Sequence, residues 1–239
     1  MTRQQRSARA AVIFDLDGTL IDSGADIAAA ANYARQALGM TPLPAAVAIG
    51  HVGDGVQRLL ERVLAHDDRR ATVSPLPSPH SAPVAAEAVA AGLAHFSAFY
   101  TEHLLDTTRL YPGIAGLLDR LAGRPLFLAT NKPRRFTLAI LAGLGIERCF
   151  RRIVAGDDVA ARKPDPAHLA ACLAGTRLGP ADVIAVGDSP NDVLAARAFG
   201  CRVVAVGWGL TAAATLAATR PDAFVATAAE LARELAVGY

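Results

Sequence analysis

Two aspartates follow an uninterrupted apolar segment near the start of the chain, in the sequence AAVIFDLDGTLIDSG of residues 10–24. Side chains alternate along an extended chain, so Asp15 and Asp17 point to the same side with a single leucine between them. Two neighbouring carboxylates repel each other unless a positive group lies between them or one of them holds a proton. The pair therefore predicts a site for a cation or for proton transfer.

Other polar side chains stand where further predicted strands end. Thr130 and Asn131 close the segment PLFLATN, Lys163 lies in ARKPDP, and Asp188 closes DVIAVGD. In an open α/β sheet, ligands bind beyond the carboxyl ends of the strands. We therefore expect these four residues, which are far apart in the sequence, to meet the aspartate pair in one crevice.

The oxygen atoms of this set suit a magnesium ion and a phosphate ester. Asp15, Asp188 and one backbone carbonyl supply hard oxygen ligands and leave positions open for water and phosphate, as Mg²⁺ requires. The metal would remove the repulsion and screen the phosphate charge, so that one carboxylate can attack phosphorus. Asp17 can be the general acid if its backbone ligates the metal while its side chain turns toward the leaving group.

These residues also have structural interpretations. An aspartate after a strand is commonly a helix N-cap or a turn residue, and a lysine beside a proline is usually a solvated loop charge. The segment SPND is typical of a helix start, with Ser189 as the N-cap, Pro190 in the first turn and Asp192 three residues after the cap. A capping role and a functional role of Asp192 can both be true.

Six short β-rich segments are predicted to position these side chains, at residues 10–14, 125–130, 152–156, 182–188, 202–209 and 222–226. They are apolar on both faces and separated by helical patterns, which indicates a parallel, Rossmann-like sheet in an α/β fold. Between Leu20 and Leu126 the chain shows helical patterns only. We therefore predict an α/β catalytic core of residues 1–21 and 109–239, with an inserted α-helical cap domain of residues 22–108.

The predicted cap contains three helical patterns, at residues 26–38, 56–64 and 85–100. Between the last two, residues 66–86 hold four prolines and three serines. Prolines lack a backbone donor and interrupt helices. This segment is predicted to be a flexible loop that links two cap helices.

Composition excludes several classes of function. The 239 residues are 52% hydrophobic with a formal net charge of +2 and no dense basic run, which argues against a nucleic-acid partner. No apolar run reaches the roughly 18 residues of a membrane span. We expect no signal peptide, because the basic N-terminus passes directly into the first predicted strand. The three cysteines have neither zinc-site nor disulfide spacing. We expect a cytoplasmic protein, a monomer or homodimer, that acts on a small molecule.

Taken in order, DLDGTL, ATN, ARKPDP and GDSPND resemble the four motifs of the haloacid dehalogenase superfamily, over nearly the whole chain. The resemblance implies that Asp15 is the nucleophile that forms an aspartyl-phosphate. It implies that Asp17 protonates the leaving group and then activates water. The other roles that it implies are phosphate binding by Thr130 and its neighbour Asn131, a bridge from nucleophile to phosphate by Lys163, direct Mg²⁺ ligation by Asp188, and orientation of the metal's water shell by Asp192.

Within that superfamily the presence of Asp17 favours phosphoester chemistry, since dehalogenases lack the second acid. A helical cap after the first strand resembles the class that acts on small soluble phosphates, and such a lid excludes water and contributes specificity. The segments IGHVGDGVQRLLERVL, RLYPGI, ATNKP and AGDDVAARKPDP resemble those of phosphoglycolate phosphatases. The resemblance therefore implies Mg²⁺-dependent hydrolysis of 2-phosphoglycolate to glycolate and phosphate.

A small acid substrate would need donors from the cap. Backbone N–H groups around Gly53 and Gly55, and the guanidinium of Arg62 or Arg58, are candidates. The structural alternative is that the two glycines only turn the chain into a helix. We expect substrate discrimination to come from this inserted segment.

Two other functions stay open. One is a phosphatase or phosphomutase for a sugar or amino-sugar phosphate, which in the mutase case would return the phosphoryl group to its substrate. The other is a non-catalytic regulatory binding protein that keeps the fold, which the complete set of acid, base and metal positions disfavours.

Overall fold

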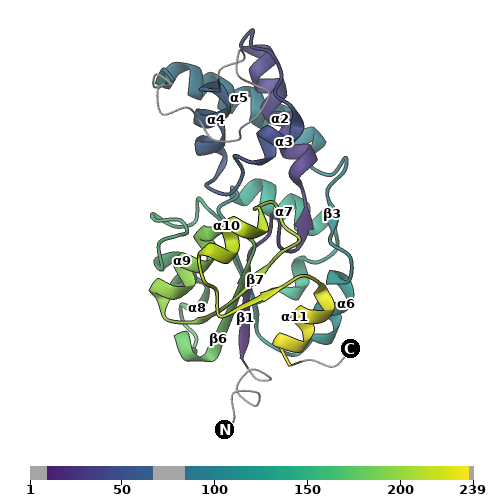
Figure 1. The fold of residues 1–239 in the computed structure, drawn as a ribbon, viewed down its shortest axis with the longest axis vertical. Coiled ribbons are helices and arrows are strands. Elements are labelled where there is room, and N and C mark those ends of the chain that lie inside the picture. The colour runs from purple at the N-terminus through teal and green to yellow at the C-terminus, as the bar shows by residue number, and fades with distance from the viewer. Residues whose placement is uncertain (1–9, 67–83, 237–239) are drawn as a thin grey trace. The chain divides into compact units, whose positions relative to one another are not determined.

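The computed structural model describes residues 10–66 and 84–236. The chain divides into two compact units, a core unit of Met1–Asp22 with Arg109–Tyr239 and a helical unit of Ser23–Thr108 (Figure 1). The core unit is therefore built from two stretches of sequence, and the helical unit is one insertion between them.

The core unit contains a six-stranded sheet in the order β5-β4-β1-β6-β7-β8, and all its strand pairs are parallel. This confirms the predicted α/β fold with a Rossmann-like parallel sheet. Every one of the six predicted segments contains a strand, slightly shorter than predicted. The strands are β1 (Ala11–Phe14), β4 (Leu126–Ala129), β5 (Arg152–Val154), β6 (Val183–Gly187), β7 (Arg202–Val206) and β8 (Ala223–Val225).

The strand register explains why distant motifs meet. Phe14 of β1 pairs with Leu128 of β4 on one side and with Val186 of β6 on the other. The residues that follow these three strands consequently leave the sheet at the same edge. Asp15 continues the ladder by one hydrogen bond, since its N–H donates to the Val186 carbonyl at 2.9 Å.

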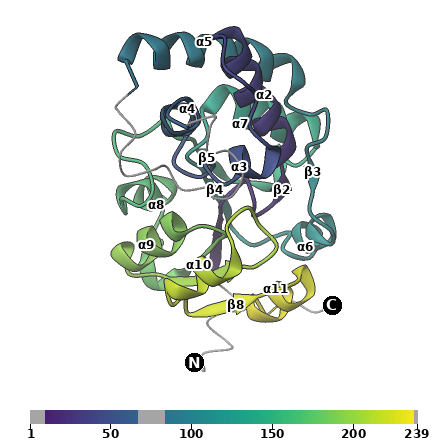
Figure 2. The ribbon, with the colours of Figure 1, turned by 45° about the horizontal axis from the view of Figure 1, so that its top comes forward.

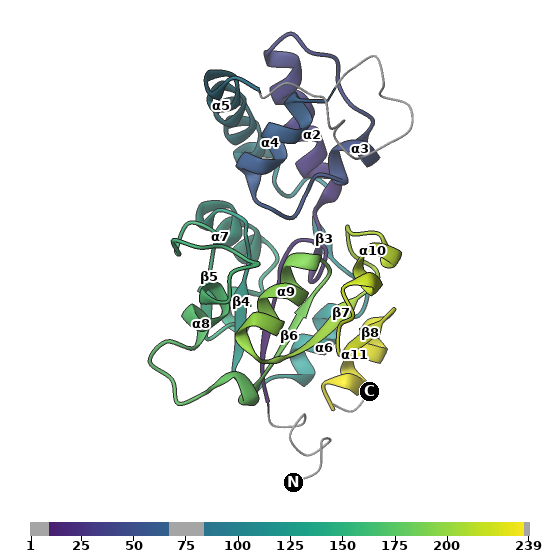
Figure 3. The ribbon, with the colours of Figure 1, turned by 60° about the vertical axis from the view of Figure 1, so that its left-hand side comes forward.

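Helices cover the sheet and exclude water from its apolar faces. One face packs in a single buried cluster against α8 (Ala167–Leu173), α9 (Pro190–Phe199) and α10 (Ala213–Ala218). Figure 3 shows α9 beside β6, and α9 also contacts β7. The other helical elements of the core unit are α6 (Ile114–Arg120), α7 (Arg134–Gly143), α11 (Ala228–Glu234) and the short 3-10 turns at Glu147–Cys149 and Pro180–Asp182.

The helical unit consists of α2 (Gly24–Ala37), α3 (Ala45–Ile49), α4 (Val56–Leu64) and α5 (Ala86–His103). The longer three correspond to the three helical patterns of the inserted segment. α2 packs along α5 (Figure 2), and α4 buries its apolar stripe of Leu59, Leu60, Val63 and Leu64. The Asp26 carboxylate accepts hydrogen bonds from the backbone N–H and hydroxyl groups of Thr107 and Thr108, which joins the two ends of the insertion.

The expectation of helices alone between Leu20 and Leu126 is wrong. A short antiparallel pair, β2 (Ile21–Asp22) with β3 (Arg109–Leu110), lies where the chain leaves the core unit and returns to it. Two-residue strands are too short to show a period of two, so no sequence pattern revealed them. Most of the predicted 66–86 loop lies outside the described residues. No helix in the described part of the chain combines the length and hydropathy that a membrane span requires.

Candidate active site

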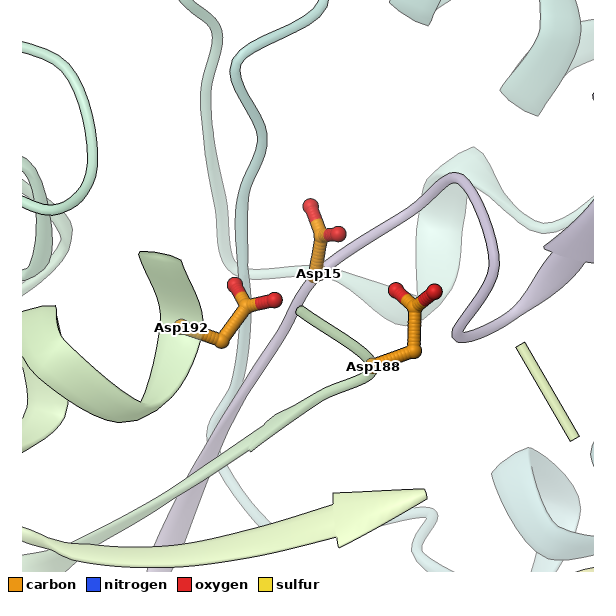
Figure 4. Close-up of side chains that lie close together, drawn as sticks. All are labelled: Asp15, Asp188 and Asp192. Atoms are coloured by element: carbon orange, nitrogen blue, oxygen red, sulfur yellow. The ribbon is translucent and has the colours of Figure 1, made fainter. Parts of the chain in front are cut away.

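Three carboxylates gather at the carboxyl edge of the sheet. Asp15 follows β1, Asp188 follows β6, and Asp192 lies in the first turn of α9. One oxygen atom of each lies within 4.8 Å of the others (Figure 4). The structure therefore brings together three of the carboxylates that the sequence analysis assigned to the metal site.

Lys163 lies among these carboxylates. Its ammonium is 2.8 Å from Asp15 Oδ1 and 2.6 Å from Asp192 Oδ1, and only 3% of its side chain is exposed. Burial is the largest influence and would lower the pKa of Lys163, but Asp15 and Asp192 together raise it above its ordinary value. The lysine is thus a fixed cation beside Asp15 and not a solvated loop charge.

Two buried side chains hold the backbone of Lys163 in place. The Asn131 side-chain amide donates to the Lys163 carbonyl at 3.0 Å, and the Lys163 N–H donates to His168 Nδ1 at 3.2 Å. The other ring nitrogen of His168 lies 3.2 Å from the Val154 carbonyl, and burial lowers the pKa of this histidine to about 4. A neutral ring can accept at Nδ1 and donate at Nε2, so His168 ties the lysine loop to the end of β5. Sequence reasoning missed His168.

Asp192 has the capping role that the sequence suggested, and it also contacts the lysine of the site. Its Oδ2 accepts hydrogen bonds from the Ser189 N–H at 3.1 Å and the Ser189 hydroxyl at 2.6 Å, which confirms the predicted helix start of α9. Its Oδ1 contacts Lys163. The helix cap fixes the carboxylate, and the fixed carboxylate in turn orients the lysine.

Asp188 is almost fully buried. Its oxygens accept from the Thr19 hydroxyl at 3.2 Å and from the Leu210 N–H at 2.8 Å. Burial, and then the nearby Asp15 and Asp192, raise the pKa of Asp188 well above its ordinary value. Burial raises the pKa of Asp15 to about 7, because the attraction of Lys163 offsets only part of the burial and of the repulsion by Asp192 and Asp17. The charge of Lys163 alone therefore does not offset the burial and mutual repulsion of these carboxylates.

Glycines provide the space for these carboxylates. A Cβ on Gly18 or Gly209 would lie 2.1–2.7 Å from atoms of the Asp188 side chain, and one on Gly187 would lie 2.2–2.5 Å from Asp192. Gly18 also has φ +81°, a conformation that glycine adopts without strain. Clustered, desolvated carboxylate oxygens with raised pKa values are a donor set that suits a hard divalent cation. The residues present thus fit Mg²⁺.

Gly209→Ala is expected to reduce turnover by about a hundredfold, because displacing a catalytic group by about 1 Å has effects of that size. The added methyl would lie 2.3–2.5 Å from three atoms of Asp188, while the Gly209 backbone is outside the left-handed region. The expected loss is therefore steric. Turnover would be measured against Gly179→Ala, where a Cβ would lie at an ordinary 3.8 Å from Asp182 Oδ2. Equal activity of the two variants would contradict this prediction.

Asp17 has a partner that the sequence analysis did not identify. The Lys132 ammonium lies 3.0 and 3.1 Å from the two carboxylate oxygens of Asp17, and the lysine side chain is 5% exposed. Its neighbour Thr130 is also buried, and the Thr130 hydroxyl accepts from the Lys132 N–H at 3.2 Å. The available signal was the position of Lys132 directly after the polar end of a strand, inside ATNKP.

The candidate cap residues belong to the helical unit, whereas the other predicted site residues belong to the core unit. Gly53 and Gly55 have φ +130° and +89°, and Gly55 is the N-cap of α4, so both are needed to turn the chain into this helix. Arg62 forms an ion pair with Asp54. Arg58, one turn earlier, pairs with Glu61 at 2.6 Å on the exposed surface.

Comparison with known proteins gives a consistent result. A family model described as haloacid dehalogenase-like hydrolase matches residues 10–200. The chain is 40% identical over 224 residues to a phosphoglycolate phosphatase of Chromobacterium violaceum, covering 92% of this chain and 94% of the relative. It is 38% identical over 230 residues to a phosphoglycolate phosphatase of Neisseria meningitidis, with 94% and 93% covered. A crystal structure described as a predicted phosphoglycolate phosphatase from Haemophilus somnus has a TM-score of 0.83 at 28% identity, covering 94% of this chain and 97% of the other.

Proposed function

This chain belongs to the haloacid dehalogenase-like hydrolases and is a phosphoric monoester hydrolase, and we propose that it converts 2-phosphoglycolate to glycolate and phosphate with Mg²⁺. The observation that carries the chemical part of the proposal is the buried contact of Asp15 with Lys163, beside Asp188 and Asp192. The substrate part is supported by the names of the relatives, which match over nearly their whole length.

Asp15, Asp188 and the Asp17 backbone carbonyl would hold the magnesium ion directly, and Asp192 would orient its water shell. When bound, the ion would offset the negative charge of the phosphate and of the carboxylates. The cluster offers the necessary oxygens, and burial and mutual repulsion, which raise the pKa values of Asp15 and Asp188, favour a cation there.

Asp15 is the proposed nucleophile. One of its oxygens forms a bond to phosphorus while the bond from phosphorus to the ester oxygen breaks, which gives an aspartyl-phosphate and glycolate. Lys163, at 2.8 Å from Asp15, stabilises the charge that is shared between nucleophile and phosphate. Thr130, with Asn131 next to it at the end of β4, would bind a phosphate oxygen.

Asp17 is the proposed general acid and base. It gives a proton to the ester oxygen as that oxygen leaves, and it then takes a proton from the water that attacks the aspartyl-phosphate. The second step releases phosphate and restores the Asp15 carboxylate. Since both steps use the same side chain, Asp17→Asn should impair formation as well as hydrolysis of the intermediate.

We propose that the helical unit acts as a cap and contributes to substrate choice through Gly53, Gly55 and Arg62. Arg62→Ala is expected to raise KM for phosphoglycolate about tenfold, the scale of one charge-assisted hydrogen bond. The effect on an aryl phosphate should be smaller, because that substrate has no second anion. Substitution of Gly53 is a poorer test, since φ +130° strains any other residue at this position.

Arg58→Ala is the matched control for Arg62→Ala, because it removes a guanidinium from the same helix where 67% of the side chain is exposed. If Arg62→Ala and Arg58→Ala have equal KM values for phosphoglycolate, Arg62 does not contribute to substrate choice. Equal losses on both substrates in Arg62→Ala would indicate damaged folding.

Phosphate release from a panel of esters at fixed Mg²⁺ tests the proposed function. Phosphoglycolate is expected to give the highest kcat/KM. Faster hydrolysis of sugar or amino-sugar phosphates would favour the alternative substrate class. Transfer of the phosphoryl group back to a sugar would indicate a phosphomutase, and complete inactivity on the panel would favour a binding protein.

A further inference from the structure

The two buried lysines of the core unit contact different aspartates. Lys163 contacts Asp15 and Asp192. Lys132 contacts both oxygens of Asp17, at 3.0 and 3.1 Å. If Asp15 is the nucleophile and Asp17 the general acid, as proposed above, Lys163 stands on the nucleophile's side and Lys132 on the side of the leaving group.

The backbone fixes Lys132 at this place. It is the third residue after β4, its N–H donates to the Thr130 hydroxyl, and its carbonyl accepts from the Gly156 N–H at 2.9 Å. The residue as a whole is 7% exposed. Lys132 is therefore buried, and both its backbone N–H and its carbonyl are hydrogen-bonded. Its ammonium lies at a defined position beside Asp17 and not in solvent.

A charge at that position has a chemical consequence for the leaving group. Asp17 must reach the ester oxygen to protonate it, so the ammonium beside Asp17 lies close to whatever is attached to that oxygen. In phosphoglycolate a single methylene separates the ester oxygen from a carboxylate. In a sugar phosphate the groups near the ester oxygen are uncharged hydroxyls.

We propose that Lys132 binds the carboxylate of the substrate and so selects phosphate esters with a negative charge next to the ester oxygen. This inference rests on the proposed function and deepens it. One ammonium can contact more than one carboxylate, as Lys163 contacts both Asp15 and Asp192, so the contact of Lys132 with Asp17 is compatible with one to the substrate. Because the lysine is buried, its attraction for a carboxylate is screened less than that of a surface charge. Substrate choice is then shared with the core unit, contrary to the expectation that it comes from the inserted segment.

The test compares 2-phosphoglycolate with 2-hydroxyethyl phosphate, which has a hydroxymethyl group in place of the carboxylate. The wild type should prefer phosphoglycolate in kcat/KM. Lys132→Gln keeps a donor for Asp17 but removes the charge, and it should reduce that preference at least about tenfold, mainly through KM for phosphoglycolate. Lys132→Arg keeps the charge and should retain most of the preference.

The ratio of the two substrates is measured on one preparation, so it does not depend on how much of a variant is folded. A wild-type preference that survives in Lys132→Gln would overturn the role of Lys132 and leave the proposed function standing. An equal fall of kcat on both substrates, with the ratio unchanged, would show that Lys132 only positions Asp17. A wild type without any preference for phosphoglycolate would overturn the proposed substrate and this inference together.

Discussion

Asp15→Asn is expected to reduce phosphate release by more than about a hundredfold while the fold is retained. An amide cannot accept the phosphoryl group, and the change also removes one carboxylate from the proposed metal site. The fold should survive because Lys163 keeps its 2.6 Å contact with Asp192. Steady-state phosphate release, circular dichroism and thermal melting measure these effects.

Asp119→Asn is a suitable control for Asp15→Asn, since it makes the same chemical change at an exposed position of the core unit. It should leave turnover at the wild-type level. Rapid acid quenching of the wild type, followed by mass spectrometry, should find a phosphoryl group on the peptide that contains Asp15. If Asp15→Asn kept more than about a hundredth of wild-type activity, the covalent mechanism would be wrong.

Removal of divalent cations with EDTA is expected to reduce activity by a similarly large factor, and added Mg²⁺ should restore it. Without a cation, burial, with repulsion from Asp192 and Asp17, outweighs the attraction of Lys163 and raises the pKa of Asp15 to about 7. A carboxylate that is partly protonated at neutral pH is a poorer nucleophile. Ca²⁺ should not replace Mg²⁺ fully, because its larger and less regular ligand shell misplaces nucleophile and phosphate.

Two measurements separate loss of metal from loss of protein. Mg²⁺ should raise the melting temperature of the wild type, since a ligand that binds the folded state stabilises it. The rise should be smaller in Asp188→Asn, and this variant should need more Mg²⁺ for half of its maximal activity. Full activity of the wild type in excess chelator would refute the proposed magnesium requirement.

The sheet and the convergence of the motifs could be predicted from the sequence because they depend on local patterns. The segments that form β1, β4 and β6 are continuous apolar runs, as expected for strands that are buried on both faces. Helices alternate with these strands along the chain. Once the strands are parallel, the residues that follow them must share one edge. The approach of Asp188 to Asp15 follows from this rule, as does the start of α9 from the local pairing of Ser189 with Asp192.

Contacts between residues far apart in the sequence were decided by the tertiary structure. The partner of Asp17 is 115 positions away, so the place of Lys132 after a strand end does not show by itself which carboxylate its ammonium contacts. The same is true of Gly209, whose missing side chain makes room for Asp188, and of the contact by which His168 links the lysine loop to Val154 at the end of β5. The sequence determined the chemical groups and the sheet edge at which they gather, because side-chain type and strand period are local properties. Which lysine faces which aspartate depends on loop paths and on close packing, and these exist only in the folded chain.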